Sequence, residues 1–186
     1  MTDASTRGEG ARERLMAEAA KRILISDGAF GTQIQNRKLE EKDYAGDLGL
    51  TADQKGNNDI LALTRPDVIE DITRAYFDAG SDIVATNTFS ANRISQADYN
   101  AEDKVEAINV ESARIACELA QEYAGKDGRP RFVAGAIGPT NKTLSLSPDV
   151  EDPGYREITF DHLVDVYHEQ AAALVKGGAD FILIET

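Results

Sequence analysis

Polar residues that could bind a ligand follow four short apolar runs of the sequence. The clusters are SDGAFGT at residues 26–32, TNTF at 86–89, GPTN at 138–141 and ET at 185–186. In the first cluster, Asp27 supplies a carboxylate, while Gly28 and Gly31 allow backbone N–H groups to converge on a ligand. A carboxylate beside free N–H groups suits a zwitterion, because the acid can hold the ammonium and the amides can hold the carboxylate.

A phosphate-binding loop is an alternative function for this glycine-rich segment, and its residues argue against it. The lysine of such loops is missing, and Asp27 would repel a phosphate. The structural alternative is a glycine-rich turn that Asp27 caps. The spacing leaves both the zwitterion site and the capped turn open.

Glu185 and the pair Asn87 and Thr88 are further candidates. Glu185 follows four apolar residues, where an unpaired carboxylate would be costly to bury. It is therefore either a ligand-binding acid or a solvated acid at the end of the chain. Asn87 and Thr88 either orient a ligand through hydrogen bonds or tie neighbouring loops together.

Residues that bind metals or act as nucleophiles are few. His162 and His168 fall on one predicted helix about 240° apart, so we expect two separate surface positions. Cys117 lies among apolar helical residues and is expected to pack in the core. These residues alone cannot assemble a zinc site, and the sequence contains no Ser-His-Asp or GxSxG element.

The elements that position these residues follow from the apolar pattern. Continuous apolar runs are typical of strands buried on both faces of a parallel sheet, and they occur at Ile23–Ile25, Asp82–Ala85, Arg131–Ile137 and Asp180–Ile184. Amphipathic periodicity predicts helices over residues 66–79, 105–123 and 163–175. Good helix formers predict another helix over 11–22, with one apolar stripe made of Leu15, Met16, Ala19 and Ala20. Residues 1–10 are predicted to form a flexible tail.

Serial βα units predict an α/β fold with a parallel sheet, either an open doubly wound sheet or a (β/α)8 barrel. In both folds ligands bind at the carboxyl ends of the strands, so we expect the four polar clusters to meet on one face. The long polar segment 138–161 is then a loop on that face. Because such a barrel takes about 250 residues, residues 11–186 are expected to form its first half, with about four βα units and an N-terminal helix.

Composition excludes several classes of partner. The net charge of −13 over 186 residues argues against nucleic acids and anionic membranes. A single cysteine is compatible with a reducing compartment. No apolar run approaches the roughly 18 residues that span a bilayer, and the first residues lack an apolar signal core. We therefore expect a cytoplasmic protein.

The run GNNDILALTRPDVIEDITRAYFDAGSDIVATNTFSANRISQADY, together with DGAFGT, VAGAIGPTNKTLSLSPDV and FILIET, closely resembles one known module. It is the N-terminal homocysteine-binding module of cobalamin-dependent methionine synthases, and the resemblance covers Ile23 to Thr186. The GPTNKT, SPDV and DP segments are similar to these synthases in particular. The wider family of homocysteine S-methyltransferases shares chiefly the DG, TNTF-like and final glutamate positions.

The resemblance implies a (β/α)8 barrel with homocysteine at its mouth and the homocysteine thiolate on a zinc ion. It further implies that this sulfur attacks the methyl group of methylcobalamin, which is then remethylated from methyltetrahydrofolate. Carried over by motif, Asp27 and Glu185 would hold the substrate ammonium. The backbone of Gly28, with Thr88 nearby, would hold its carboxylate. The other substrate-binding positions that the resemblance implies are Phe30, Gly31 and Asn87.

The zinc ligands of that family are cysteines after the sixth and eighth barrel strands. The resemblance therefore implies partners outside these residues, namely the remaining barrel half and the folate and cobalamin modules, and it implies that the chain alone is inactive. Two alternatives stay open: a non-catalytic amino-acid-binding or interaction protein derived from the synthase, and a fragment of a cobalamin-independent homocysteine S-methyltransferase. A barrel enzyme for phosphorylated molecules is disfavoured by the acidic strand ends.

Overall fold

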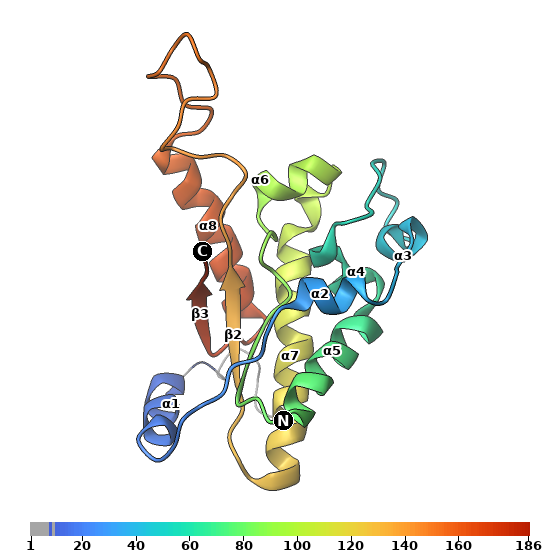
Figure 1. Cartoon of the computed structure of the whole chain (residues 1–186), viewed down its shortest axis with the longest axis vertical. Coiled ribbons are helices and arrows are strands. Elements are labelled where there is room, and N and C mark those ends of the chain that lie inside the picture. The colour runs from blue at the N-terminus through green and yellow to red at the C-terminus, as the bar shows by residue number, and fades with distance from the viewer. Residues whose placement is uncertain (1–7, 9) are drawn as a thin grey trace.

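A computed structural model describes residue 8 and residues 10–186, so most of the tail predicted over residues 1–10 lies outside the described residues. The chain forms an α/β fold around a parallel sheet (Figure 1). Its strands are β1 (Ile83–Ala85), β2 (Phe132–Ile137) and β3 (Phe181–Ile184), in the spatial order β1-β2-β3. Each connection between neighbours crosses over through a helix, as parallel pairing requires.

Helices occupy most of the remaining chain. Their bounds are α1 (Ala11–Ala19), α2 (Phe30–Gln35), α3 (Glu41–Ala45), α4 (Leu61–Thr64), α5 (Pro66–Asp78), α6 (Arg93–Gln96), α7 (Val105–Asp127) and α8 (Phe160–Lys176), with short 3-10 turns η2 (Asn58–Ile60), η3 (Ala97–Tyr99) and η4 (Glu102–Lys104). The three long helices α5, α7 and α8 coincide with the predicted amphipathic segments and pack on the sheet.

The predicted first strand is wrong. Residues 23–25 are not a strand, and the chain makes only one isolated parallel bridge to the sheet, between Ser26 and Ile83. The carbonyl of Ile25 accepts from the Asp82 and Ile83 amides at 2.7 and 3.1 Å. Ile23 is 84% exposed, so it lacks the packing on both faces that its apolar character predicted. The apolar residues of this segment predicted a strand, but Ile23 lacks packing partners and the segment pairs with the sheet through a single bridge.

The apolar stripe predicted on the first helix is also not buried. Met16 is 59% exposed, and Ala11 is the buried residue of α1. Charged contacts instead attach this part of the chain near the amino ends of the strands (Figure 1). Arg14 meets Asp180 at 3.3 Å, and Arg22 meets Asp82 at 2.7 Å.

These two aspartates occupy equivalent places in the links AGSD and GGAD, which precede β1 and β3. Each accepts a backbone N–H from the neighbouring segment: Asp82 Oδ2 from Ile25 at 3.0 Å and Asp180 Oδ2 from Val133 at 2.8 Å. Both carboxylates are buried. The repeated sequence thus builds the same junction twice, joining neighbouring segments at the amino edge of the sheet.

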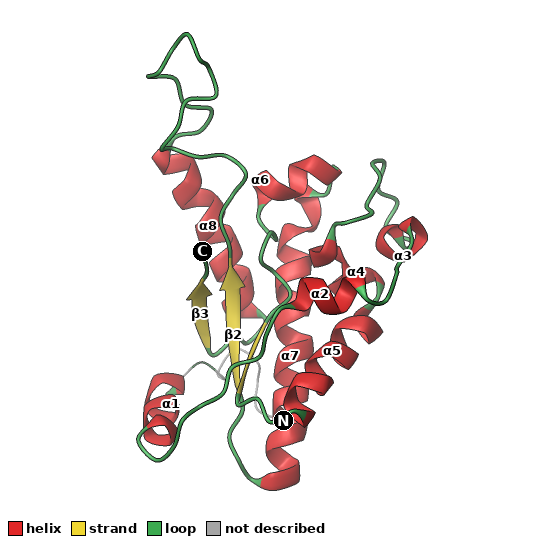
Figure 2. Cartoon of the chain, viewed as in Figure 1, coloured by secondary structure: helices red, strands yellow, loops and turns green. Residues whose placement is uncertain are grey.

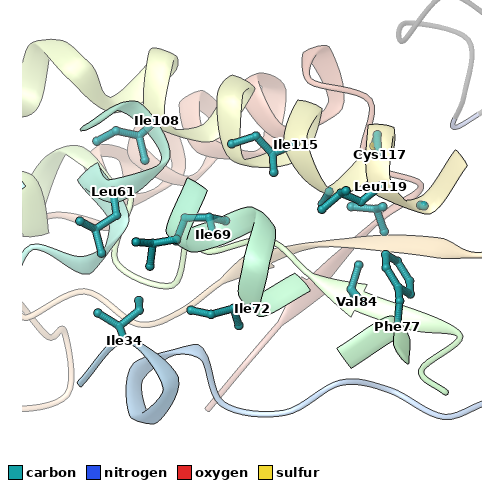
Figure 3. Close-up of a cluster of buried hydrophobic side chains, with 14 of the residues drawn as sticks. Ile34, Leu61, Ile69, Ile72, Phe77, Val84, Ile108, Ile115, Cys117 and Leu119 are labelled. Carbon is teal, nitrogen blue, oxygen red and sulfur yellow. The ribbon is translucent and has the colours of Figure 1, made fainter. Parts of the chain in front are cut away.

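The main core lies between the sheet, α5 and α7. Pro66 begins α5, as expected for a residue whose missing N–H costs nothing in a first helical turn. Ile69 and Ile72 of α5 pack with Ile108 and Ile115 of α7 in one buried cluster (Figure 3). Cys117 belongs to the same cluster, which confirms its predicted core position, and its thiol donates to the Gly178 carbonyl at 3.1 Å.

Gly177, at the end of α8, packs tightly against α7. A Cβ atom at this position would lie 2.6 Å from both the Ala113 Cβ and the Val110 carbonyl oxygen. Neither backbone nor an alanine methyl can move aside cheaply, so this crossing requires glycine. The close packing sets α8 against α7 and thereby positions the start of β3.

Candidate functional site

A cavity of about 730 Å³ opens at the carboxyl ends of the parallel strands. The loops that follow the strands leave from this end of the sheet (Figure 2). All seven residues named as substrate-binding candidates line the cavity: Asp27, Gly28, Phe30, Gly31, Asn87, Thr88 and Glu185. The structure therefore brings together residues that follow β1, β3 and the segment bridged to β1 at Ser26, as the carboxyl-edge rule for parallel sheets predicts.

Asp27 is half-buried at the wall of this cavity. Its Oδ2 accepts from the Ala85 amide at 2.8 Å, and its Oδ1 from the Ser26 hydroxyl at 3.2 Å. Burial raises the pKa of Asp27, and the nearby Glu185 carboxylate raises it further, while the two hydrogen bonds act in the opposite direction. Asp27 is thus held in place by two hydrogen bonds that only partly offset the cost of burying its charge.

Glu185 reaches the cavity because the β2–β3 pairing continues past the end of β3. Its backbone N–H donates to the Ile137 carbonyl at 3.0 Å, which fixes its place beside β2. Among the residues that the structure describes, none forms a hydrogen bond or ion pair with its carboxylate. The side chain is half-buried, so it is neither a fully solvated surface acid nor a paired one.

The electrostatic character of the cavity is one-sided. Its described lining contains four carboxylates and no lysine, arginine or histidine; the acids are Asp27, Asp59, Asp98 and Glu185. The influence of Glu185 on the pKa of Asp27 shows that these two carboxylates lie within electrostatic reach of each other. Two such acids attract a cationic group and repel phosphate.

Thr88 and Asn87 support the loop after β1. The Thr88 hydroxyl donates to the Ala136 carbonyl at 2.7 Å. The hydroxyl oxygens of Thr86 and Thr88 lie 2.6 Å apart. Since the single hydroxyl proton of Thr88 is used in this way, the hydroxyl can act towards a ligand only as an acceptor. Asn87 donates from Nδ2 to the Asn58 carbonyl at 2.7 Å, so it ties this loop to the 56–60 segment.

At Gly28 in the first polar cluster, a Cβ atom would lie 3.2 Å from the Tyr76 hydroxyl, which donates to the Ala29 carbonyl at 3.0 Å, so a larger residue here would push Tyr76 aside by a few tenths of an ångström. Gly31 has open space instead, with nothing within 4 Å of the equivalent position. The Phe30 ring lies beside Tyr76 with 6.1 Å between ring centroids. No side chain caps the first turn of α2.

Sequence reasoning missed Asp59, which lies in η2 within the GNND segment. The residue is only 7% exposed, and its Oδ1 accepts from the Ser90 amide at 3.1 Å. Burial raises its pKa from 3.8 to about 7. The signal in the sequence is an acid placed directly before the apolar run ILAL.

The long loop after β2 contributes to the cavity only at its beginning, through Pro139, Thr140 and Asn141. Beyond these residues it extends away from the body of the molecule (Figure 1). At its base, a Cβ atom on Gly138 would lie 2.6 Å from the Phe89 carbonyl and 2.7 Å from the Phe89 ring. The Gly138 amide donates to that same carbonyl at 3.0 Å, so the loops after β1 and β2 meet through their backbones.

Both histidines lie on the exposed side of α8, as predicted. Cys117 is buried in α7 and is not among the residues that line the cavity. Within the described part of the chain, no group of three or more His, Cys, Asp or Glu side chains could hold a metal ion. No helix of this part is long and apolar enough to cross a membrane.

The sequence model of the homocysteine S-methyltransferase family matches residues 24–186. This chain belongs to that family. Among solved structures, it is similar to the homocysteine methyltransferase MmuM from Escherichia coli. With the metallated form it shares 20% identity and a TM-score of 0.68, covering 92% of this chain and 57% of that one.

Two further forms of the same Escherichia coli protein are similar. The oxidized form gives 21% identity and a TM-score of 0.68, over 91% of this chain and 55% of that chain. The apo form gives 20% identity and a TM-score of 0.60, over 91% of this chain and 51% of that chain. At these identities the likeness establishes a shared fold, and the present chain spans little more than half the length of these proteins.

Proposed function

We propose that this chain forms the homocysteine-binding part of a cobalamin-dependent methionine synthase, which transfers a methyl group from methylcobalamin to homocysteine. The observation that carries the amino-acid part of the proposal is the pairing of Asp27 and Glu185 in one cavity without a cationic side chain in the described lining. The choice of methyl donor rests on a separate observation, the GPTNKT and SPDV segments of the long loop.

In this proposal the ammonium of homocysteine lies between Asp27 and Glu185. Each carboxylate accepts a charge-assisted hydrogen bond from it, and such bonds are worth about 1.5–3 kcal/mol. The substrate carboxylate lies against backbone N–H groups near Gly28, since the first turn of α2 has no capping side chain. Thr88 supports this wall through Ala136 and does not donate to the substrate.

The described residues do not fit a zinc centre. The single thiol, that of Cys117, donates to a carbonyl inside the core, and both histidines are exposed on α8. Zinc would supply a Lewis acid that lowers the pKa of the substrate thiol. In the proposed enzyme the zinc ligands, the rest of the barrel and the folate and cobalamin modules belong to parts other than these residues, and the role of this chain is to bind and orient the amino acid.

Isothermal titration calorimetry tests the amino-acid site directly. We expect the chain to bind L-homocysteine and to bind its deaminated analogue at least about tenfold more weakly, because that analogue cannot neutralise the two acids. Glu185→Gln should weaken homocysteine binding by a similar factor. The matched control is Glu151→Gln, which removes the same charge from an exposed position of the long loop outside the cavity.

Equal affinity for homocysteine and for the deaminated analogue would contradict the proposed ammonium site. No homocysteine binding by the chain would contradict the proposed function as a whole. If Glu151→Gln weakened binding as much as Glu185→Gln, the effect would come from overall charge rather than from the cavity.

A further inference from the structure

The loop after β1 is held by hydrogen bonds to its backbone carbonyls. Each carbonyl of residues 87–91 accepts a hydrogen bond from another segment, and most of the donors are buried side chains. In chain order the donors are Ser112 Oγ at 3.3 Å, Gln170 Nε2 at 2.8 Å, the Gly138 amide at 3.0 Å, Gln96 Nε2 at 3.2 Å and Asn109 Nδ2 at 2.7 Å. The peptide planes of this loop are therefore fixed by residues of α6, α7, α8 and the loop after β2.

A bound carbonyl also fixes the direction of the N–H group that follows it. The peptide unit is planar and trans, so the N–H of each residue points opposite to the carbonyl of the residue before it. The peptide between Phe89 and Ser90 shows this arrangement. Its carbonyl accepts from the Gly138 amide, and its N–H donates at 3.1 Å to Oδ1 of Asp59, a carboxylate of the cavity lining. One N–H of this loop thus already binds a carboxylate at the cavity.

Thr88 and Phe89 carry N–H groups without such a partner. Ser112 of α7 holds the carbonyl of Asn87 and so turns the N–H of Thr88 away from that helix. In the same way Gln170 of α8 holds the Thr88 carbonyl and turns the N–H of Phe89 away from α8. Neither N–H has a hydrogen-bond partner among the residues that the structure describes, and both residues line the cavity. Since Thr88 is buried, its N–H requires a partner.

These N–H groups lie within reach of an amino acid whose ammonium is held by Asp27. The Ala85 amide donates to Asp27 at 2.8 Å, and Thr88 is three residues further along the chain, so the two amides are at most about 10 Å apart. A hydrogen bond at each end of a ligand takes about 2.9 Å, and an α-amino acid carries its ammonium and its carboxylate on one carbon. Its carboxylate can therefore lie between the backbone near Gly28 and the N–H groups of Thr88 and Phe89.

We propose that Gln170 is a positioning residue for the carboxylate of the bound amino acid; this inference rests on the proposed function. Gln170 is not among the residues that line the cavity. Its amide holds the Thr88 carbonyl, which aims the N–H of Phe89 at the substrate carboxylate, beside the N–H of Thr88. Ser112 acts in the same way one peptide earlier. The substrate carboxylate thus completes the hydrogen bonds of two backbone N–H groups that the described residues leave unpaired.

The other half of the Gln170 amide supports this role. The side chain is fully buried in α8, and its Oε1 has no partner among the described residues. Burying an amide with one half unpaired costs stability, so an apolar side chain of similar length would serve packing at least as well. The hydrogen bond to Thr88 is the contact that accounts for a glutamine at this position.

Calorimetric titration with two ligands tests the role of Gln170. L-homocysteine and its decarboxylated analogue, an aminopropanethiol, share the ammonium and the thiol, so the ratio of their affinities isolates carboxylate binding. In the wild-type chain homocysteine should bind at least about tenfold more tightly. Gln170→Met keeps the length of the side chain and removes its N–H donors. It should reduce the ratio about fivefold with little change in the urea midpoint, and Ser112→Ala should also reduce the ratio.

Thr73→Val is the matched control. Thr73 is a buried residue of α5 whose hydroxyl donates to the Ile69 carbonyl at 2.9 Å, and it is not part of the cavity lining. This variant should keep the wild-type ratio. An unchanged ratio in folded Gln170→Met overturns the inference, and Ser112→Ala decides in its place if Gln170→Met does not fold. An equal loss in Thr73→Val overturns it too, because the loss of any buried hydrogen bond would then suffice.

Two results with the wild-type chain separate this inference from the proposed function. Equal affinity for homocysteine and its decarboxylated analogue would overturn the inference and leave the ammonium site in place. Failure to bind homocysteine at all contradicts the proposed function itself, and the inference with it.

Discussion

Replacing Asp59 by asparagine should make the protein more stable at neutral and alkaline pH. Burial raises the pKa of Asp59 from 3.8 to about 7 in the folded chain. A group whose pKa is raised by folding contributes stability that is fully present below about pH 4 and is lost as the pH rises through about 7. Asparagine cannot ionise, yet its carbonyl can still accept the Ser90 N–H, so the variant avoids this loss.

The magnitude follows from the width of that pH window. The two pKa values differ by about three units, and each unit corresponds to about 1.4 kcal/mol. Ionising Asp59 in the folded state therefore costs up to about 4 kcal/mol above pH 8. This is a large share of a typical stability of about 5–15 kcal/mol. The wild-type chain should lose this contribution to its free energy of unfolding between about pH 4 and pH 7, and Asp59→Asn should remove most of that loss.

Urea denaturation of both chains across this pH range measures the effect. Asp98→Asn serves as the matched control, because Asp98 is exposed and bonded to Asn141, so the curve of this variant should run parallel to that of the wild type. A stability difference between Asp59→Asn and the wild type that stays constant with pH would refute the reasoning. It would mean that Asp59 keeps an ordinary pKa in spite of its burial.

Three other substitutions test separate parts of the structure. Asp27→Asn should raise the melting temperature slightly at pH 7, because folding raises the pKa of this half-buried acid, and the same substitution should weaken homocysteine binding. A lower melting temperature would show that the hydrogen bond from the Ala85 amide needs the charge of Asp27. Arg22→Ala should destabilise the chain by about 3 kcal/mol, since it leaves buried Asp82 without its cation, and urea denaturation giving under about 1 kcal/mol would contradict this. Gly138→Ala should lower the free energy of unfolding by about 1–3 kcal/mol, because its Cβ would clash with Phe89. Gly31→Ala is the control, since nothing lies within 4 Å of a Cβ atom there, and equal melting temperatures for the two variants would contradict the clash.

The sequence predicted the long elements well because their signals are repeated many times. Pro66 and the spacing of Val68, Ile69 and Ile72 placed α5, and the polar clusters at strand ends placed seven candidate residues in one cavity. That placement follows from the geometry of parallel sheets. Whether these residues bind a substrate stays a prediction.

The failures came where short apolar runs were taken to imply burial. Ile23 and Met16 are apolar but exposed, because the segments that contain them are attached by Arg14 and Arg22 rather than by packing. Asp59 was missed because its place in the cavity depends on residues distant in sequence, such as Ser90, whose amide donates to its carboxylate. Contacts of this kind depend on the folded chain and leave no local pattern.

The contact between Gly138 and Phe89 implies that the two parts of the long loop after β2 tolerate sequence change to different extents: its base should change slowly among homologues and its outer part quickly. Its first residues share a wall with the cavity, and any side chain at position 138 would displace Phe89, next to Thr88. Further out, Val150 is 96% exposed, and nearby turns are closed by local bonds such as those from Ser147 to the Asp149 and Asp152 carbonyls. Homologues should therefore vary freely in the length and composition of this outer part, and an inserted tag or fluorophore there should leave the cavity intact.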